Sequence, residues 1–293
     1  MRNSGKRNAS HEDKNQIVGG MLYLVATPIG NLSDISERAL KVLSQVDFIA
    51  AEDTRNSGKL LAYFGISKPM ISYFEHNKRE RGLVILEKLK AGESCALITD
   101  AGTPAISDPG EDLVVLCAEN DIPVTSVPGC SAVVNALALS ALPTGRFCFE
   151  GFLSTNKNER LTRLNELKTD TRTTVFYEAP HKLIKTLEDL YQIFGNRRLA
   201  LCRELTKLNE EIIRTTLEGA LEHYKEILPR GEYVLVVEGN TTPSNDGAFW
   251  RDMTIAEHVE YYIAREMKKM DAIKTVAKDR GVSKSAIYKE VNT

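Results

Sequence analysis

Residues 100–110 read DAGTPAISDPG and follow directly behind the apolar run CALIT at 95–99. A carboxylate such as Asp100, held beside exposed backbone groups, suits a ligand that carries amines, hydroxyls or a positive charge. Gly102 lets the backbone approach a ligand closely, and Pro104 stiffens the loop. The loop holds no Lys or Arg, and the chain has no GxxxxGK[ST] motif, so a phosphate cradle is not indicated.

The second half of this loop has a structural interpretation. Asp108 is expected to cap the following helix, with Pro109 at the first helical position and Glu111 three residues after the cap. This interpretation leaves Asp100, Gly102 and Thr103 as the residues without a role in starting a helix. They are therefore the predicted ligand-binding part of the loop.

Two more turns have the same position behind an apolar run. TPIGN at 27–31 and PGCSA at 128–132 each follow a predicted strand. Ser33 or Asp34 is expected to cap the helix after the first turn, and Ser131 lies near the start of the helix after the second. In an open α/β sheet, ligands bind beyond the carboxyl ends of the strands, so three such loops are expected to converge on one pocket.

Charged clusters at predicted strand ends supply candidate proton acceptors. They are AEDTR (51–55), FEHN (74–77), FYEAPHK (176–182) and RELTK (203–207). Asp53 and Glu204 are the first candidates, because a neighbouring cation keeps each carboxylate ionised, although it also weakens the carboxylate as a base. Glu52, His76 and Glu178 are the other candidates. Each cluster taken alone can also be explained as charged residues that are exposed to solvent and have no role in catalysis.

Other chemistries have little support. The five histidines are scattered without HExxH or HxH spacing, and no GxSxG motif occurs, so neither a zinc site nor a serine triad is predicted. The five cysteines are odd in number and never closely paired, which is typical of reduced thiols in a cytoplasmic protein. No metal ion is expected.

The elements that must position these residues alternate along the chain. Short β-type runs at 22–26, 47–51, 70–74, 95–99 and 123–127 are separated by segments with helical apolar spacing. Strands that alternate with helices imply crossover connections and a largely parallel sheet. The sequence therefore predicts a disordered leader at 1–20 and an N-terminal α/β domain at 21–143.

A second series follows the boundary segment at 142–153. Strands are expected at 173–178, 198–205, 211–217 and 232–239, and helices at 156–168, at 181–195 and up to about residue 228. This series predicts a C-terminal α/β domain at 144–239. Residues 240–249 have the polar composition of a linker.

The remaining residues, 250–293, are expected to form a small all-α appendage. DAIKTVAKDRGVSKSAIYKEV at 271–291 resembles a helix-turn-helix, with Ser283 capping a second helix that presents Lys284, Tyr288 and Lys289. Three interpretations stay open: a unit that docks on RNA, a DNA-binding regulator, and helices that simply pack on the main body.

Nothing in the sequence indicates a membrane protein. The longest nearly apolar stretch, at 131–142, is too short to span a bilayer and is expected to be a core helix. The leader lacks the apolar section of a signal peptide, which favours a cytoplasmic protein. The formal net charge of −2 excludes a global basic field, so any nucleic-acid contact must use a local patch.

Seven blocks together carry a resemblance to a known family. They are TPIGNLSDIS, AAEDTR, EHN, DAGTPAISDPG, PGCSA, FYEAPHK and RELTK, spread in this order over residues 21–240. The chain resembles the tetrapyrrole methylase superfamily. AEDTR, EHN and RELTK favour its branch that methylates ribosomal RNA over the branch that methylates corrin rings.

The resemblance implies two α/β domains with a cleft between them, which binds S-adenosylmethionine in a homodimer. The implied reaction is methylation of the ribose 2′-hydroxyl of a cytidine in small-subunit ribosomal RNA, as naked RNA or in the assembled subunit. Arg55, Lys207, Lys284 and Lys289 are the basic residues expected to meet the RNA. The residues expected to bind the cofactor are Pro28, Asp100, Gly102, Thr103, Pro104, Ile106, Ser131, Ala132 and Tyr177. The alternative substrates within the superfamily are corrin precursors and a diphthine intermediate.

Overall fold

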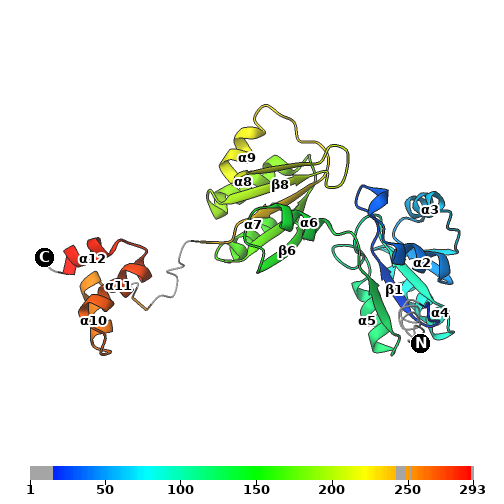
Figure 1. Ribbon diagram of the computed structural model, residues 1–293, viewed down its shortest axis with the longest axis horizontal. Coiled ribbons are helices and arrows are strands. Elements are labelled where there is room, and N and C mark those ends of the chain that lie inside the picture. The colour runs from blue at the N-terminus through cyan, green and yellow to red at the C-terminus, as the bar shows by residue number, and fades with distance from the viewer. Residues whose placement is uncertain (1–15, 242–248, 251, 292–293) are drawn as a thin grey trace, which may run out of the picture.

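The computed structural model describes residues 16–241, 249–250 and 252–291 (Figure 1). Most of the expected leader, and most of the expected linker at 240–249, lie outside the described residues. The described residues form two five-stranded sheets with helices around them and three further helices near the C-terminus. No helix in the described ranges is long and apolar enough to cross a membrane.

The first sheet is wholly parallel, as predicted, with strand order β3-β2-β4-β1-β5. Its central strands are buried on both sides, between one apolar cluster around Val25, Ile49 and Ile98 and another around Phe48 and Leu97. The strands are β1 (Leu22–Val25), β2 (Phe48–Ala51), β3 (Met70–Ser72), β4 (Cys95–Ile98) and β5 (Val124–Val127). The helices of this series are the short 3-10 helix η2 (Leu32–Asp34), α2 (Glu37–Gln45), α3 (Thr54–Tyr63), α4 (Lys78–Lys90), α5 (Glu111–Glu119) and α6 (Ala132–Leu139).

The second sheet is mixed, with strand order β6-β7-β10-β8-β9. β6 and β7 are parallel, and the other neighbouring pairs are antiparallel. Its strands are β6 (Phe147–Phe152), β7 (Thr173–Glu178), β8 (Arg198–Arg203), β9 (Glu211–Thr216) and β10 (Tyr233–Val237). Its helices are α7 (Lys157–Leu167), α8 (Leu183–Phe194) and α9 (Leu217–His223). β6 was not predicted, and α9 ends earlier than the sequence indicated.

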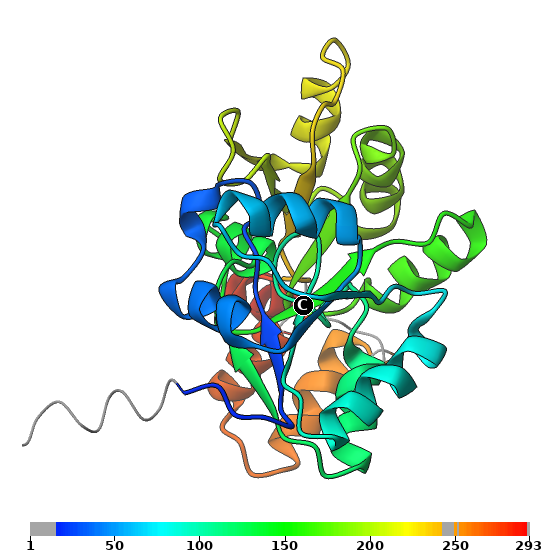
Figure 2. The ribbon, with the colours of Figure 1, turned by 90° about the vertical axis from the view of Figure 1, so that its right-hand side faces the viewer.

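Helix α6 joins the two sheets. It follows β5 of the first sheet, but its buried residues Val133, Ala136 and Leu137 pack with Val175 and Val236 of the second sheet. Figure 1 shows this helix beside the second sheet, and Figure 2 turns the molecule so that the elements of the first sheet face the viewer. The second sheet buries its other face under α7, α8 and α9, through a separate apolar cluster.

The three C-terminal helices are α10 (Ile255–Ile263), α11 (Lys269–Arg280) and α12 (Lys284–Val291), and they share an apolar core of their own. A capping box of Thr254 and Glu257 starts α10. Arg280 fixes the unit internally, because its guanidinium donates to His258 Nδ1 at 3.1 Å and to the carbonyl of Met253 at 2.6 Å. The predicted cap of α12 is confirmed, since Ser283 Oγ accepts from the backbone N–H of Ala286.

Candidate functional site

Three loops meet at the carboxyl edge of the first sheet. Thr27 and Gly102 exchange two backbone hydrogen bonds, of 2.8 and 3.0 Å, which join the loop after β1 to the loop after β4. Thr103 Oγ1 donates to the carbonyl of Cys130 at 3.0 Å, which adds the loop after β5. The three loops singled out in the sequence therefore converge in one place.

The loop after β4 has an unusual backbone. Ala105 (φ 66°) and Ser107 (φ 63°) are left-handed without being glycine, and Gly102 (φ 87°) and Gly110 (φ 145°) also have positive φ. Left-handed residues that carry a Cβ cost about 1–3 kcal/mol each and persist only where the surroundings enforce them, often at ligand clamps. This backbone is consistent with a loop shaped to hold a ligand.

The expected cap at Asp108 is wrong. Helix α5 starts at Glu111, its N-cap residue is Gly110, and no side chain caps it. Gly110 has a φ of 145°, outside the helical range, so the helix starts only after it. A Cβ at this position would lie 2.8 Å from Leu97 Cδ2, so the position needs glycine. Asp108 and Pro109 consequently stay in the loop.

The expected caps at Ser33 and Asp34 are also wrong. Ser36 caps α2 by accepting a hydrogen bond from the Ala39 N–H at 3.1 Å. Ser33 and Asp34 instead lie inside η2, which Asn31 caps. The chain makes one extra tight turn before the helix, and this turn moves the cap two or three residues along.

Asp108 is the carboxyl that sequence reasoning missed. Burial raises its pKa to about 6, and the nearby negative charge of Glu52 adds to the rise, while a hydrogen bond with Thr99 opposes it. Glu52 itself accepts a hydrogen bond from Thr99 Oγ1 at 2.8 Å. A carboxyl with a pKa near 6 is ionised at neutral pH and still basic enough to accept a proton.

The two first-choice proton acceptors lie in different surroundings. Asp53 caps α3 and pairs with the guanidinium of Arg55 at 2.7 Å, and these hydrogen bonds lower its pKa to about 2. Burial would raise the pKa of Glu204, but hydrogen bonds from the Glu232 N–H and from Lys207 outweigh it, so that this pKa is lowered. A lowered pKa makes each carboxylate a weaker base than Asp108.

The other candidates are less free to react or lie further out. Glu178 is 5% exposed and accepts hydrogen bonds from the Ala179 N–H at 2.8 Å and from Thr186 Oγ1 at 2.5 Å. These bonds hold its carboxylate against the start of α8. His76 is exposed, with its ring edge-on to Phe74 at 6.3 Å.

Aromatic side chains of the second sheet face the loop after β4. The Tyr177 ring lies 4.9 Å from the Phe149 ring and 5.4 Å from the Phe152 ring. Burial raises the Tyr177 pKa to about 12, with a contribution from the charge of Asp108. A Cβ at Gly151 would come within 2.9 Å of Ser107 Oγ, so the edge of the second sheet and the loop of the first nearly touch.

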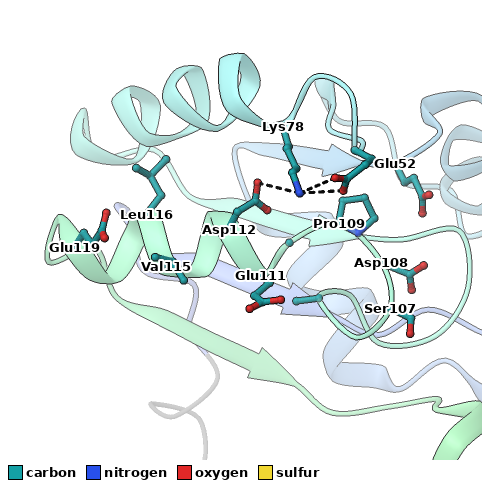
Figure 3. A pocket seen from close by; sticks show the side chains of 13 residues that line it. Glu52, Lys78, Ser107, Asp108, Pro109, Glu111, Asp112, Val115, Leu116 and Glu119 are labelled. Carbon is teal, nitrogen blue, oxygen red and sulfur yellow. Dashed lines mark hydrogen bonds and ion pairs between the residues drawn. The ribbon is translucent and has the colours of Figure 1, made fainter. Parts of the chain in front are cut away.

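One hollow on this edge, the acidic hollow, has a volume of about 790 Å³. It lies between α4, α5 and the loop after β4, and Figure 3 shows Glu52 and Asp108 at one end of it. Lys78 is the one cation among the described residues of its wall, and it lies between Asp112 and Glu75, with an ion pair of 2.8 Å to Glu75. The remaining acidic residues of its wall are Glu111 and Glu119. This wall disfavours a phosphate group.

A second hollow, the α3 hollow, has a volume of about 310 Å³ and lies between both sheets' loops. The turn after β1 and the loop after β8 close it, because a Cβ at Gly30 would clash with Lys207 Cγ and lie 3.1 Å from Thr206 Oγ1. Two of the expected cofactor residues, Pro28 and Asp100, line this hollow together with Lys207.

The other expected residues are placed as follows. Ser131 is the N-cap residue of α6 without a side-chain capping bond, and Ala132 is the first residue of the helix. Arg55 is 87% exposed on α3, whereas Lys284 and Lys289 lie on α12, outside the two sheets. Within the described ranges, no group of three or more His, Cys, Asp or Glu side chains could hold a metal ion.

The profile of the family of tetrapyrrole (corrin/porphyrin) methylases matches residues 21–221. A curated relative from Halalkalibacterium halodurans, named ribosomal RNA small subunit methyltransferase I, is 48% identical over 92% of this chain and 93% of its own length. A protein of the same name from Bacillus subtilis is 44% identical, with the same coverage of both chains. A third, from Thermotoga maritima, is 46% identical over 75% of this chain and 99% of its own length.

Solved structures share the fold at much lower identity. A diphthine synthase superposes with a TM-score of 0.57 and 14% identity, over 75% of this chain and 89% of that one. A cobalt precorrin-4 methyltransferase of cobalamin biosynthesis superposes with a TM-score of 0.54 and 19% identity, over 74% and 94%. These two likenesses concern the fold alone.

Proposed function

Since this chain belongs to the tetrapyrrole methylase family, we propose that it is a methyltransferase that uses S-adenosylmethionine and acts on small-subunit ribosomal RNA. One observation carries the proposal. Relatives named ribosomal RNA small subunit methyltransferase I are 44–48% identical to this chain over 92% of its length. The finer proposal is transfer to the ribose 2′-hydroxyl of a cytidine in the cytoplasm, where the substrate is naked RNA or the assembled small subunit.

The residues at the carboxyl edge of the first sheet fit such a cofactor. Its sulfonium and ammonium groups are cationic, and Asp100 supplies negative charge in the loop after β4. The left-handed backbone at Gly102 and the aromatic wall at Tyr177 suit close approach and an adenine ring. When bound, S-adenosylmethionine supplies an activated methyl group. The residues proposed to hold it are Pro28, Asp100, Gly102, Thr103, Pro104, Ile106, Ser131, Ala132 and Tyr177.

The protein's own contribution is alignment and proton acceptance. Holding the attacking oxygen in line with the methyl carbon supplies much of the rate, because the reacting groups no longer have to find each other. A hydroxyl is a poor nucleophile until it begins to lose its proton to a positioned base. Asp53 and Glu204 stay candidates for this base. Asp108 joins them as the first candidate, because its raised pKa makes it the strongest base of the three.

A methyl-transfer assay tests the proposed function. S-adenosylmethionine with a labelled methyl group is incubated with the protein and either deproteinised small-subunit RNA or intact small subunits. We expect label in the RNA, in a nucleotide that resists alkaline cleavage at its 3′ side because its 2′-oxygen is blocked. Label in a free corrin precursor, with none in RNA, would favour the small-molecule alternative.

We also propose that the protein is a homodimer. Helix α6 exposes Val134, 59% accessible, and Leu139 on the side away from the second sheet's core. Apolar side chains that gather into one exposed patch mark protein interaction sites. Light scattering from the full chain tests this proposal against the monomer mass of 32.6 kDa.

Residues 250–293 are proposed as an RNA-docking appendage on the two α/β domains at 21–143 and 144–239. The helices have their own core, and the Thermotoga maritima relative is matched over 99% of its length by only 75% of this chain. A protein of the same name therefore has no counterpart for a quarter of this chain. Arg280, however, is used inside the unit, so the docking role rests on exposed residues such as Lys278 and Lys284.

Deleting residues 250–293 should leave S-adenosylmethionine affinity unchanged, weaken RNA binding and flatten its dependence on salt. Each lost phosphate contact removes about one unit from the slope of log affinity against log salt. Binding is measured at two salt concentrations beside thermal unfolding. Lys284→Glu in the full chain is the matched variant, because it changes charge without removing the apolar core. A truncated protein that loses stability but binds RNA normally while folded would contradict docking.

A further inference from the structure

The α3 hollow is best explained as a binding site for one unstacked nucleoside. We propose that it receives the nucleoside whose ribose is methylated, and that Ser57 and Asn56 on α3 position this nucleoside. The assignment rests on the proposed function, and it adds the place where the RNA substrate enters the protein. Neither residue stood out in the sequence.

The position of the hollow places its occupant beside the cofactor residues. Its wall includes Pro28 and Asp100, which the proposed cofactor site also uses, and it includes Thr99 at the end of β4. Its volume of about 310 Å³ lies near the lower end of the range for small-ligand pockets, about 300–1,000 Å³, and suits a nucleoside better than a long chain. Thr99 also forms a hydrogen bond with Asp108, so the ribose of a nucleoside here would lie next to the transferred methyl group and near the proposed proton acceptor.

Ser57 is the observation that points to a ligand. It is 3% exposed, and its Oγ is buried without a hydrogen-bond partner in the described part of the chain. Leaving a buried hydroxyl unsatisfied costs roughly 1–3 kcal/mol, so such a group calls for an explanation. A substrate hydroxyl or base edge in the hollow that Ser57 lines would supply the missing partner.

Asn56 fixes the neighbouring wall. Its Nδ2 donates to Asp100 Oδ2 at 3.0 Å, which ties α3 to the loop after β4. The bond holds the wall that carries Ser57 at a set distance from the expected cofactor loop. Movement of α3 would therefore change the nucleoside site and the cofactor loop together.

Charge distinguishes the two hollows as sites for RNA. The acidic hollow presents six carboxylates against Lys78, and the phosphates that flank a nucleotide would be repelled there. The α3 hollow has only two carboxylates in its described wall, Asp100 and Glu232, and Lys207 pairs with Glu232. Outside it, α3 carries the exposed cations Arg55 and Lys59 one helical turn apart. The amino end of α3 also has a positive dipole. Phosphates on either side of a bound nucleoside would lie in favourable surroundings.

The test is Ser57→Ala in the full chain. We expect kcat/KM for small-subunit RNA to fall about tenfold, through a higher KM, because one hydrogen bond to the substrate is lost. S-adenosylmethionine affinity, measured by calorimetry, should stay unchanged. The midpoint of thermal unfolding should not fall, because the variant removes an unsatisfied group and no hydrogen bond of the fold.

Ser94→Ala is the matched control. Ser94 is 2% exposed, and its Oγ donates to Asp47 Oδ2 at 2.7 Å, far from the hollow along β4. We expect this variant to lose stability and keep its KM, which is the opposite pattern. A purely structural role of Ser57 would give the same pattern as Ser94.

Three results would overturn the assignment. If the wild type is active and Ser57→Ala keeps its kcat/KM, the nucleoside does not bind in this hollow, and the proposed function still stands. If Ser57→Ala loses affinity for S-adenosylmethionine, the hollow binds the cofactor and not the nucleoside. A wild type that transfers no methyl group to small-subunit RNA would overturn the proposed function, and the assignment with it.

Discussion

Replacing Asp108 with Asn is expected to lower the single-turnover rate of methyl transfer by about 100-fold or more, the usual effect of removing a general base. Asn has nearly the same shape as Asp but cannot accept the proton. S-adenosylmethionine should still bind, because Asp108 is not among the residues proposed to hold it. Rapid-quench measurement with saturating cofactor and RNA reads the chemical step directly.

The wild-type rate should depend on pH in the same experiment. The Asp108 pKa of about 6 means that the carboxyl is mostly protonated at pH 5 and mostly ionised at pH 7. The rate should therefore rise across this interval with a midpoint near 6, and the Asn variant should lack this rise.

Protein stability provides a second, independent test of the raised Asp108 pKa. The pKa of Asp108 is raised above its ordinary value of 3.8, so the folded protein binds the proton more tightly than the unfolded chain. The contribution of Asp108 to the free energy of unfolding therefore falls as the pH rises from about 4 to 6. At pH 7 the Asn variant should be no less stable than wild type, although it is far less active.

Asp53→Asn is the matched control for the proton acceptor. Asn caps helices about as well as Asp, so α3 should keep its start. The Asp53 pKa of about 2 predicts no change of ionisation between pH 5 and 7. If the true base were Asp53 or Glu204, the rate of wild type would be flat over that interval and Asp108→Asn would keep its activity.

The second large effect is expected at Gly30, where Ala should weaken S-adenosylmethionine binding at least about tenfold by displacing Pro28 from the cofactor site. The added methyl group would clash with Lys207 and lie 3.2 Å from the carbonyl of Leu205, a backbone atom that cannot easily move. Lys207 would have to give up its ion pairs with Glu204 and Glu232, at 3.0 and 2.8 Å. Calorimetry measures the affinity.

Gly145→Ala separates this effect from a general cost of losing a glycine. No atom lies within 4 Å of a Cβ at Gly145, and its backbone needs no positive φ. This variant should bind the cofactor as wild type does. Wild-type affinity in Gly30→Ala would mean that the turn after β1 does not contribute to the cofactor site.

The sequence predicted the framework of the site because local patterns determine it. The five strands of the first sheet and the loops behind three of them follow from short apolar runs and turn residues. Strand β6 escaped prediction because Gly151, at a bulge with φ 63°, interrupts its alternation. A segment with this composition has the pattern of a boundary between domains.

The two residues that matter most in the proposals were missed for a different reason. Asp108 has the local pattern of a helix cap, but the non-helical φ of 145° at Gly110 keeps it in the loop, and a Cβ at that position would meet Leu97, thirteen residues away in the sequence. Ser57 lies in the polar segment NSGK, and serine side chains are mostly exposed in folded proteins. That its hydroxyl is buried without a partner depends on segments distant in the sequence, so no local pattern could reveal it.

Helix α6 also has a consequence for how the chain folds. It is connected to the first sheet but contributes Val133, Ala136 and Leu137 to the core of the second. A fragment cut after residue 143 would expose these side chains to water, and the remainder would lack three of the residues that fill its core. Melting should therefore be a single cooperative transition for residues 21–239, because neither sheet reaches its full stability without the other.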